Sequence, residues 1–173
     1  MKRIVNGLVL VCALGIASVA SAAEGSKLGF VDVQKVLLLS EAGKEAKEQL
    51  SLRANKYEGD KNAREEELKK LKADLEKQSV LLSETARGAK EKDYQQKYKE
   101  YQRFVKDAQD DLQAKNEELT NKLVDEIIKV IQGYGKSNGY TFIFVRNESM
   151  LYADDKADLT DEMLKAFNAA KKK

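Results

Sequence analysis

Apolar residues recur at alternating intervals of four and three positions through residues 44–82, which is the spacing of one face of an α-helix. Lys61, Arg64 and Gln78 continue the same register, so the repeat is that of a coiled-coil heptad with a polar middle. The apolar members of this stripe are Leu50, Ala54, Tyr57, Leu68, Leu71, Leu75 and Leu82. The spacing predicts one long helix over residues 44–82.

A second stripe with the same spacing predicts another long helix over residues 89–133. Between the two helices, Ser83, Thr85 and Gly88 are turn and capping residues, which places the tip of an antiparallel helical hairpin near residues 83–88. The second stripe consists of Tyr94, Tyr98, Tyr101, Val105, Ala108, Leu112, Lys115 and Leu119. The chain contains no proline, which favours uninterrupted helices, and each helix would be about 60 Å long at about 1.5 Å per residue.

After Leu119 the apolar register shifts, which is typical of a coiled coil that enters a globular part. The shifted positions are Leu123, Ile127, Val130 or Ile131, and Tyr134. Glycines at 133, 135 and 139 are expected to end the helix.

Three short segments have the aromatic and β-branched composition of strands: residues 28–33, 140–145 and 150–153. The polar residues 146–149 predict a turn, so the last two strands are expected to form a hairpin. Asp32 is expected to cap the segment after the first strand. Thr160 is expected to cap a final helix whose apolar face holds Met163, Leu164 and Phe167. Three short strands leave exposed edges, which predicts that the bodies of several chains associate.

Residues 1–22 have the basic start, short apolar run and small-residue end of a secretory signal peptide, with cleavage near Ala22. The alternative is a membrane anchor, but the apolar run of about 13 residues is shorter than the roughly 20 that span a bilayer. Cleavage also removes Cys12, the only cysteine. An exported chain without cysteines fits a bacterial periplasm better than a eukaryotic secretory route.

The composition excludes several kinds of chemistry. With no histidine, and no cysteine after residue 22, the chain has no histidine base, thiolate nucleophile or zinc site. The acidic runs 65–67 and 110–111 are interpreted as exposed helix positions that point in different directions, and residues 133–139 do not have the spacing of a phosphate loop. We therefore predict no catalytic residues, no metal site and no cofactor. After residue 22 the basic and acidic residues balance, which argues against a nucleic-acid partner.

Charge is distributed unevenly along the chain. Residues 69–106 contain eleven basic and six acidic residues, a net charge of +5, whereas residues 138–167 contain three basic and six acidic residues, a net charge of −3. For any single lysine, a solvated helix face explains the charge. For the segment as a whole, a basic helical tip that attracts acidic, flexible chains or anionic surfaces is an equal alternative.

Four stretches, taken in order, resemble the Skp family of periplasmic chaperones, also called the OmpH family. They are residues 27–37 (KLGFVDVQKVL), 81–87 (LLSETAR), 139–145 (GYTFIFV) and 158–165 (DLTDEMLK). The resemblance covers essentially the whole chain after residue 22. It implies a homotrimer with a small β body and three helical arms around a cavity, which holds unfolded outer-membrane proteins without ATP.

With that resemblance, the expected fold class is α+β. Residues 44–133 form a long antiparallel helical hairpin, which we call the arm. Residues 23–43 and 134–173 form the body, which is expected to trimerise. The predicted client-binding charges near the tip are Lys77, Arg87, Lys90, Lys92, Lys97 and Lys99. The predicted assembly residues are Leu28, Phe30, Val31, Val33, Phe142, Phe144, Leu151 and Tyr152. The main alternative is a periplasmic structural or adaptor coiled coil that binds one folded partner. Contact of the basic tip with an anionic membrane surface is compatible with the chaperone function.

Overall fold

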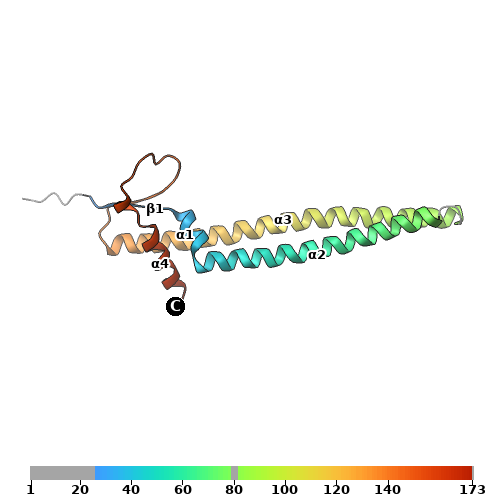
Figure 1. Ribbon diagram of the computed structural model, residues 1–173, viewed down its shortest axis with the longest axis horizontal. Coiled ribbons are helices and arrows are strands. Elements are labelled where there is room, and N and C mark those ends of the chain that lie inside the picture. Colours follow the sequence, from blue (N-terminus) through green and yellow to red (C-terminus); the bar gives the residue numbers. More distant parts are fainter. Residues whose placement is uncertain (1–25, 79–81, 173) are drawn as a thin grey trace, which may run out of the picture.

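The computed structural model describes residues 26–78 and 82–172 as a long helical arm with a small body at one end (Figure 1). The predicted signal peptide lies outside these residues. In chain order the elements are β1 (Leu28–Val31), α1 (Val33–Leu39), α2 (Glu41–Gln78), α3 (Glu84–Ser137), β2 (Phe142–Val145), the 3₁₀ helix η1 (Asp155–Ala157) and α4 (Thr160–Lys171). We call the end of the arm beside the body its root and the opposite end its tip.

The predicted helical hairpin is confirmed, although the helix ends differ from the expectation. α3 begins at Glu84, five residues before the predicted start, because the Ser83 side chain accepts a hydrogen bond from the Ala86 amide and caps it there. α3 also continues past Gly133 and Gly135 to Ser137, so the prediction that these two glycines end the helix was wrong. The chain leaves the helix at Gly139, whose φ of +68° is the left-handed conformation that favours glycine.

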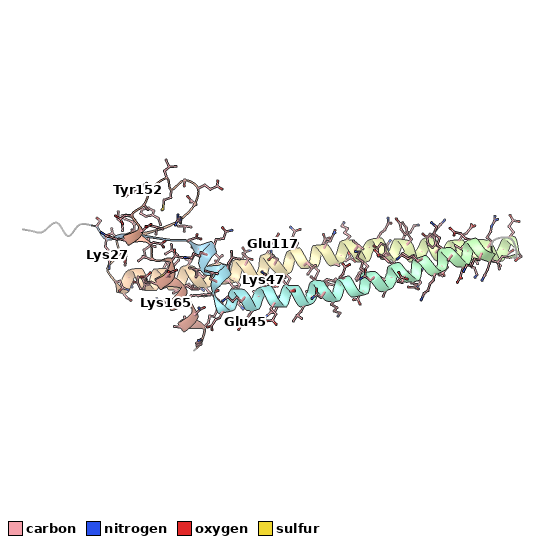
Figure 2. All side chains as sticks on the ribbon, viewed as in Figure 1. Lys27, Glu45, Lys47, Glu117, Tyr152 and Lys165 are labelled. Atoms are coloured by element: carbon pink, nitrogen blue, oxygen red, sulfur yellow. The ribbon has the colours of Figure 1, made fainter. Side chains whose placement is uncertain are left out.

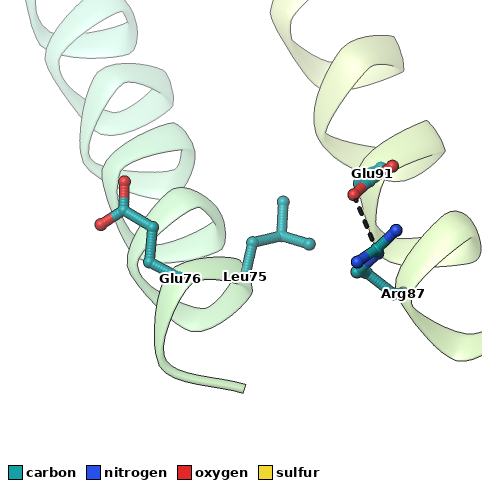
Figure 3. A pocket seen from close by; sticks show the side chains of 4 residues that line it. All are labelled: Leu75, Glu76, Arg87 and Glu91. Carbon is teal, nitrogen blue, oxygen red and sulfur yellow. Dashed lines mark ion pairs between the residues drawn. The ribbon is translucent and has the colours of Figure 1, made fainter. Parts of the chain in front are cut away.

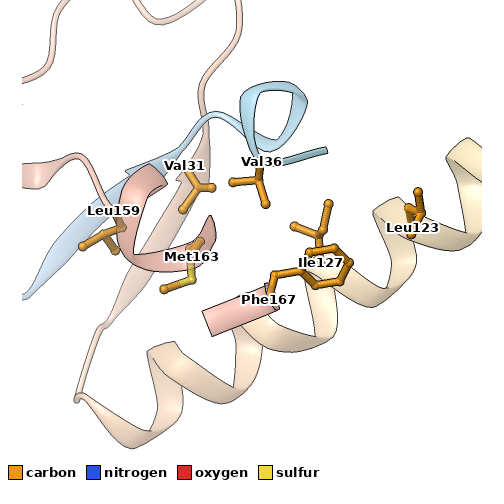
Figure 4. Packing of buried hydrophobic residues seen from close by; sticks show 7 residues of the cluster. All are labelled: Val31, Val36, Leu123, Ile127, Leu159, Met163 and Phe167. Atoms are coloured by element: carbon orange, nitrogen blue, oxygen red, sulfur yellow. The ribbon is translucent and has the colours of Figure 1, made fainter. Parts of the chain in front are cut away.

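α3 is longer than α2, 54 residues against 38, and its last turns extend beneath the body. The core packs on this extension. Leu123 and Ile127 of α3 meet side chains from β1, α1, α4 and the residue before α4 (Figure 4). The buried cluster is Val31, Val36, Leu123, Ile127, Leu159, Met163 and Phe167. The register shift after Leu119 therefore correctly predicted which α3 residues enter the globular part.

The sheet has two strands, β1 and β2, and they are parallel, with Leu28 opposite Phe142 and Val31 opposite Val145. The predicted hairpin of residues 140–145 with 150–153 was wrong, because residues 150–153 form no strand. β2 pairs instead with a strand more than 100 residues earlier, and the whole arm serves as the crossover that parallel strands need. The turn after β2 is present, since the Met150 amide donates to the carbonyl of Asn147 at 3.0 Å.

Hydrogen bonds tie the start of α4 to the start of α1. Asp32 caps α1 as predicted and accepts from the Lys35 amide at 2.8 Å. Thr160 does not cap α4, which corrects the expectation, because Thr160 is already helical and its buried hydroxyl accepts from the Asp32 amide at 3.0 Å. The Thr160 amide donates to the Asp158 carboxylate at 2.8 Å. The bond from the Asp32 amide to Thr160 therefore joins the two segments, and the other two bonds fix the local turns on either side of it.

Candidate functional site

The arm has little buried interior. Of the described residues between 44 and 119, only Leu68 and Ala108 are buried, because two helices that pack on one stripe leave most of their surface in water. The helices therefore stay together through a narrow contact, and most arm side chains are available to a partner.

Polar side chains join α2 and α3 across the middle of the arm. Arg53 donates from Nε and Nη2 to the two carboxylate oxygens of Asp111 at 2.5 and 2.6 Å, and the Tyr57 hydroxyl donates to Asp111 Oδ2 at 2.8 Å. The bond from Arg53, followed by that from Tyr57, holds the pKa of Asp111 below its ordinary value. The bond to Asp111 in turn raises the pKa of Arg53.

The heptad repeat missed one inward residue of α2. Arg64 is exposed, although its guanidinium lies over the Phe104 ring of α3, and the neighbouring Glu65 is half-buried, where its Oε1 accepts from the Tyr101 hydroxyl at 2.5 Å. That bond to Glu65 raises the pKa of Tyr101. Glu65 and Asp111 were both interpreted as exposed helix positions. Glu65 lies three residues before Leu68 and Asp111 lies three residues after Ala108, and this helical spacing was the signal that both face the partner helix.

The six predicted tip charges do not form one cluster. Arg87 pairs with Glu91 at 3.4 Å, Lys97 pairs with Glu67 of α2 at 3.1 Å, and half-buried Lys90 donates to Gln78 Oε1 at 2.8 Å. The bond to Glu67 raises the pKa of Lys97. The remaining three, Lys77, Lys92 and Lys99, are exposed and form no ion pair within the described part of the chain.

Depressions lie near both ends of the arm, and two of them differ in their linings. The first, near the tip, has a volume of about 350 Å³ and is lined by Leu75 and Glu76 of α2 and by the Arg87–Glu91 pair of α3 (Figure 3). The second, at the root between α1, α2 and α3, has a volume of about 170 Å³ and a largely apolar lining. Its leucines are Leu37, Leu38, Leu50, Leu119 and Leu123. The root cleft therefore offers apolar surface that the sequence pattern did not identify.

The predicted assembly residues divide into exposed and buried members. Leu28, Phe142 and Phe144 are about half exposed, and the rings of Phe142 and Phe144 stack with centroids 5.9 Å apart. Leu151 and Tyr152 are almost fully exposed on the loop that projects from the body (Figure 2). Val145, at the end of β2, is also exposed, and the assembly prediction did not include it. We call these six residues the exposed body surface.

The other predicted assembly residues face inward within this chain. Phe30 and Val31 are buried, with exposed fractions of 4% and 0%. Val33 is half-buried and packs against the core. Val31 belongs to the core that α3 and α4 complete, Val33 packs against it, and the Arg146 guanidinium lies 5.6 Å from the centre of the Phe30 ring, so all three contribute first to the body of their own chain. Among residues 26–78 and 82–172, no helix combines the length and the apolar character that crossing a membrane requires.

Comparison with known proteins gives concordant matches. The family model described as Outer membrane protein (OmpH-like) matches residues 27–167. An uncharacterized protein of Aquifex aeolicus (strain VF5) is 33% identical over 138 residues, which is 80% of this chain and 83% of that protein. The fold is similar to the crystal structure of a candidate outer membrane chaperone (OmpH-like) from Caulobacter crescentus CB15. That match has a TM-score of 0.79 at 16% identity and covers 84% of this chain and 86% of the other.

Proposed function

Because the chain belongs to the OmpH-like outer membrane protein family, we propose that it is a periplasmic chaperone that holds unfolded outer-membrane proteins without ATP. In this proposal the chain is exported, loses residues 1–22 and forms a homotrimer. Three arms then enclose a cavity in which the unfolded client is kept from aggregating. The protein performs no catalysis and needs no cofactor, since holding a client requires binding energy alone.

The observation that carries the proposal is the combination of a long thin arm with a body that leaves apolar surface uncovered. Phe142, Phe144 and Leu151 are 57%, 50% and 95% exposed, although large apolar side chains on a small body normally pack against something. Within the described residues, β2 pairs with β1 only, so its other edge is open. Association of three bodies through this surface would cover it and place three arms side by side.

The arm has two kinds of surface that suit an unfolded client. Its outer half carries the net positive charge, with Lys77, Lys92 and Lys99 free to meet acidic side chains. The root cleft, at about 170 Å³, is close to the volume of about 150 Å³ that accepts a benzene ring. Unfolded outer-membrane barrel chains expose alternating apolar residues, and many weak contacts from three arms act together once one contact has formed.

The first test is whether the chain suppresses aggregation of a urea-unfolded outer-membrane barrel protein that is diluted into buffer without nucleotide. Light scattering should fall when about one trimer is present per client. Unchanged scattering across several such clients, together with saturable binding to one native protein, would favour the folded-partner adaptor instead.

The contribution of the tip charges is tested with two matched double variants. Lys92→Glu with Lys99→Glu should weaken holding, because the client then meets a less positive tip, and added salt should weaken holding by the wild-type protein in the same direction. Lys44→Glu with Lys56→Glu makes the same charge change on exposed α2 positions nearer the root. Equal holding by both variants would contradict a special contribution of the tip.

The assembly prediction is tested by Phe142→Asp, which places a charge in the exposed body surface. We expect light-scattering mass measurement to report a monomer. Leu52→Asp is the control, because Leu52 is also exposed, at 64%, but lies on the arm. A trimer that survives Phe142→Asp would contradict the proposed assembly surface.

A further inference from the structure

The middle of the arm lacks the side chains that usually hold a helical hairpin together. Residues 53–67 of α2 contain no Leu, Ile, Val, Phe or Met, whereas Leu50 and Leu52 precede this stretch and Leu68 follows it. At about 1.5 Å per residue the leucine-free stretch spans roughly 22 Å of the helix. Aliphatic side chains of α2 larger than alanine therefore do not help to close the hairpin over this length.

A chain of polar and aromatic contacts closes it instead. At the root end, Arg53 and Tyr57 converge on Asp111. The Tyr57 ring meets Phe104 edge-on with centroids 6.0 Å apart, and the Arg64 guanidinium lies 4.4 Å above the Phe104 ring. Toward the tip, Tyr101 donates to Glu65. We call this set the mid-arm lock: Arg53, Tyr57, Arg64 and Glu65 of α2 with Tyr101, Phe104 and Asp111 of α3.

These contacts are more directional than leucine packing. A bidentate arginine–carboxylate pair requires both side chains to lie in one plane at one separation, and the hydroxyl bonds of Tyr57 and Tyr101 add two further fixed points. Sliding α2 by one helical turn along α3 would break all three. The contacts therefore specify one register, as single polar residues do in coiled coils.

The same contacts give little net stability, because the arginine and carboxylate side chains are 44% and 36% exposed and water competes for them. Gly59 adds a separate observation in the same stretch. A Cβ at Gly59 would meet nothing within 4 Å, so packing does not require glycine there, and glycine weakens a helix. The leucine-free stretch is thus closed specifically but weakly, between a root and a tip that are closed by leucines.

We propose that the mid-arm lock sets the register of the hairpin and is a latch, whose release separates α2 from α3 at the middle of the arm while the root and the tip stay closed. In such an arm, α2 and α3 can separate and come together again over the leucine-free stretch while both stay helical. The inference concerns the arm by itself and stands whether or not the arm binds unfolded chains.

The test is the distance between two spin labels placed on opposite helices, measured by pulsed electron paramagnetic resonance. The chain from Ala23 onward is used, because it contains all the described structure and no cysteine. Labelled chains are diluted with unlabelled ones, so that only distances within one chain contribute. The label sites are exposed positions, and the pairs are Asn62 with Gln102 at the lock, Gln49 with Asn116 at the root and Lys72 with Gln95 toward the tip.

Asp111→Asn keeps the shape of the side chain and removes the charge that Arg53 grips. The neighbouring Asp110→Asn is the matched control, because it makes the same charge change at an exposed residue outside the lock. We expect Asp111→Asn to lengthen and broaden the distance at the lock pair and to leave the other two pairs unchanged. Asp110→Asn should change none of the three.

Two results would overturn the proposal. If Asp111→Asn gives the same distances as Asp110→Asn, the polar contacts do not hold the helices together. If all three pairs lengthen equally, the residues stabilise the whole arm and are not a local latch. Tyr57→Phe removes only one bond to Asp111 and should change the distance at the lock pair less than Asp111→Asn does. The three variants should therefore rank by the number of lock bonds that each removes.

Discussion

Replacing Gly43 by alanine is expected to destabilise the protein, although alanine is the better helix former. Gly43 lies in the first turn of α2, where α1 turns back against it. A Cβ at this position would lie 1.7 Å from the carbonyl oxygen of Leu37 and 3.0 Å from the hydroxyl oxygen of Ser40. Because the nearest atom belongs to the backbone, α1 itself must move to make room.

Two opposing effects set the magnitude. Overpacking a close contact typically costs about 1–3 kcal/mol, and the gain in helix propensity from glycine to alanine is about 1 kcal/mol. The net loss is therefore up to about 2 kcal/mol. Moving α1 would also strain the bonds of the buried Ser40, whose hydroxyl donates to the Leu37 carbonyl and accepts from the Gly43 amide, each at 3.0 Å.

Gly59→Ala is the matched control, because it is the same substitution in the same helix with nothing within 4 Å of the new Cβ. It should stabilise the protein by up to about 1 kcal/mol. Urea unfolding followed by circular dichroism, at one chain concentration for all variants, measures both. With a slope of about 2 kcal/mol per molar urea, the midpoint should fall by up to about 1 M for Gly43→Ala and rise by up to about 0.5 M for Gly59→Ala. A Gly43→Ala midpoint at or above that of the wild type would refute the close-contact argument.

Three further predictions follow from the body and the arm. Phe167→Ala removes a ring that is 1% exposed in the core and should lower the free energy of unfolding by about 3–5 kcal/mol. The same urea titration measures this loss, and a value below about 1 kcal/mol would contradict the assigned core. Thr160→Val leaves the Asp32 amide without its acceptor and should cost about 1–3 kcal/mol, whereas Thr160→Ser should retain most of that bond. The pKa of Asp111 is lower in the folded arm than its ordinary value of 3.8, so the stabilisation from the Asp111 carboxylate is present above pH 3.8 and is lost as the pH falls through the lower folded value. The label distance across the mid-arm lock should therefore stay constant from pH 7 to about 5 and lengthen only below pH 3.8. Lengthening near pH 6 would contradict that sign.

Signals within a few residues of each other predicted their structures well. The four-and-three spacing of apolar residues identified both arm helices, and the register shift identified Leu123 and Ile127 as core residues. The caps at Asp32 and Ser83 were also recognisable, because a capping side chain bonds an amide only three residues away. Each of these features depends on geometry that one short segment contains.

Features that join distant segments were missed. The composition of residues 140–145 predicts a strand but not its partner, and the neighbouring β-like segment at 150–153 was chosen in place of β1. Likewise, the hydroxyl of Thr160 bonds an amide 128 residues away and not its own helix end. Of the predicted tip charges, Lys92 and Lys99 are exposed, and their contact with a client stays a prediction. The root cleft was not predicted, because three separate helices form it.

The sequence by itself determined that this protein is a helical hairpin on a small body, because periodic burial on a helix and local capping bonds need no knowledge of the rest of the chain. Only the tertiary structure decided that the sheet is parallel and that Asp111 and Glu65 face the opposite helix. It also decided which apolar side chains the chain covers for itself, so that Val31 lies in the core while Phe142 and Phe144 remain exposed. The physical reason is that alternation along a strand shows two faces without saying which face meets the core, and α3 and α4 settle that choice by packing on one of them.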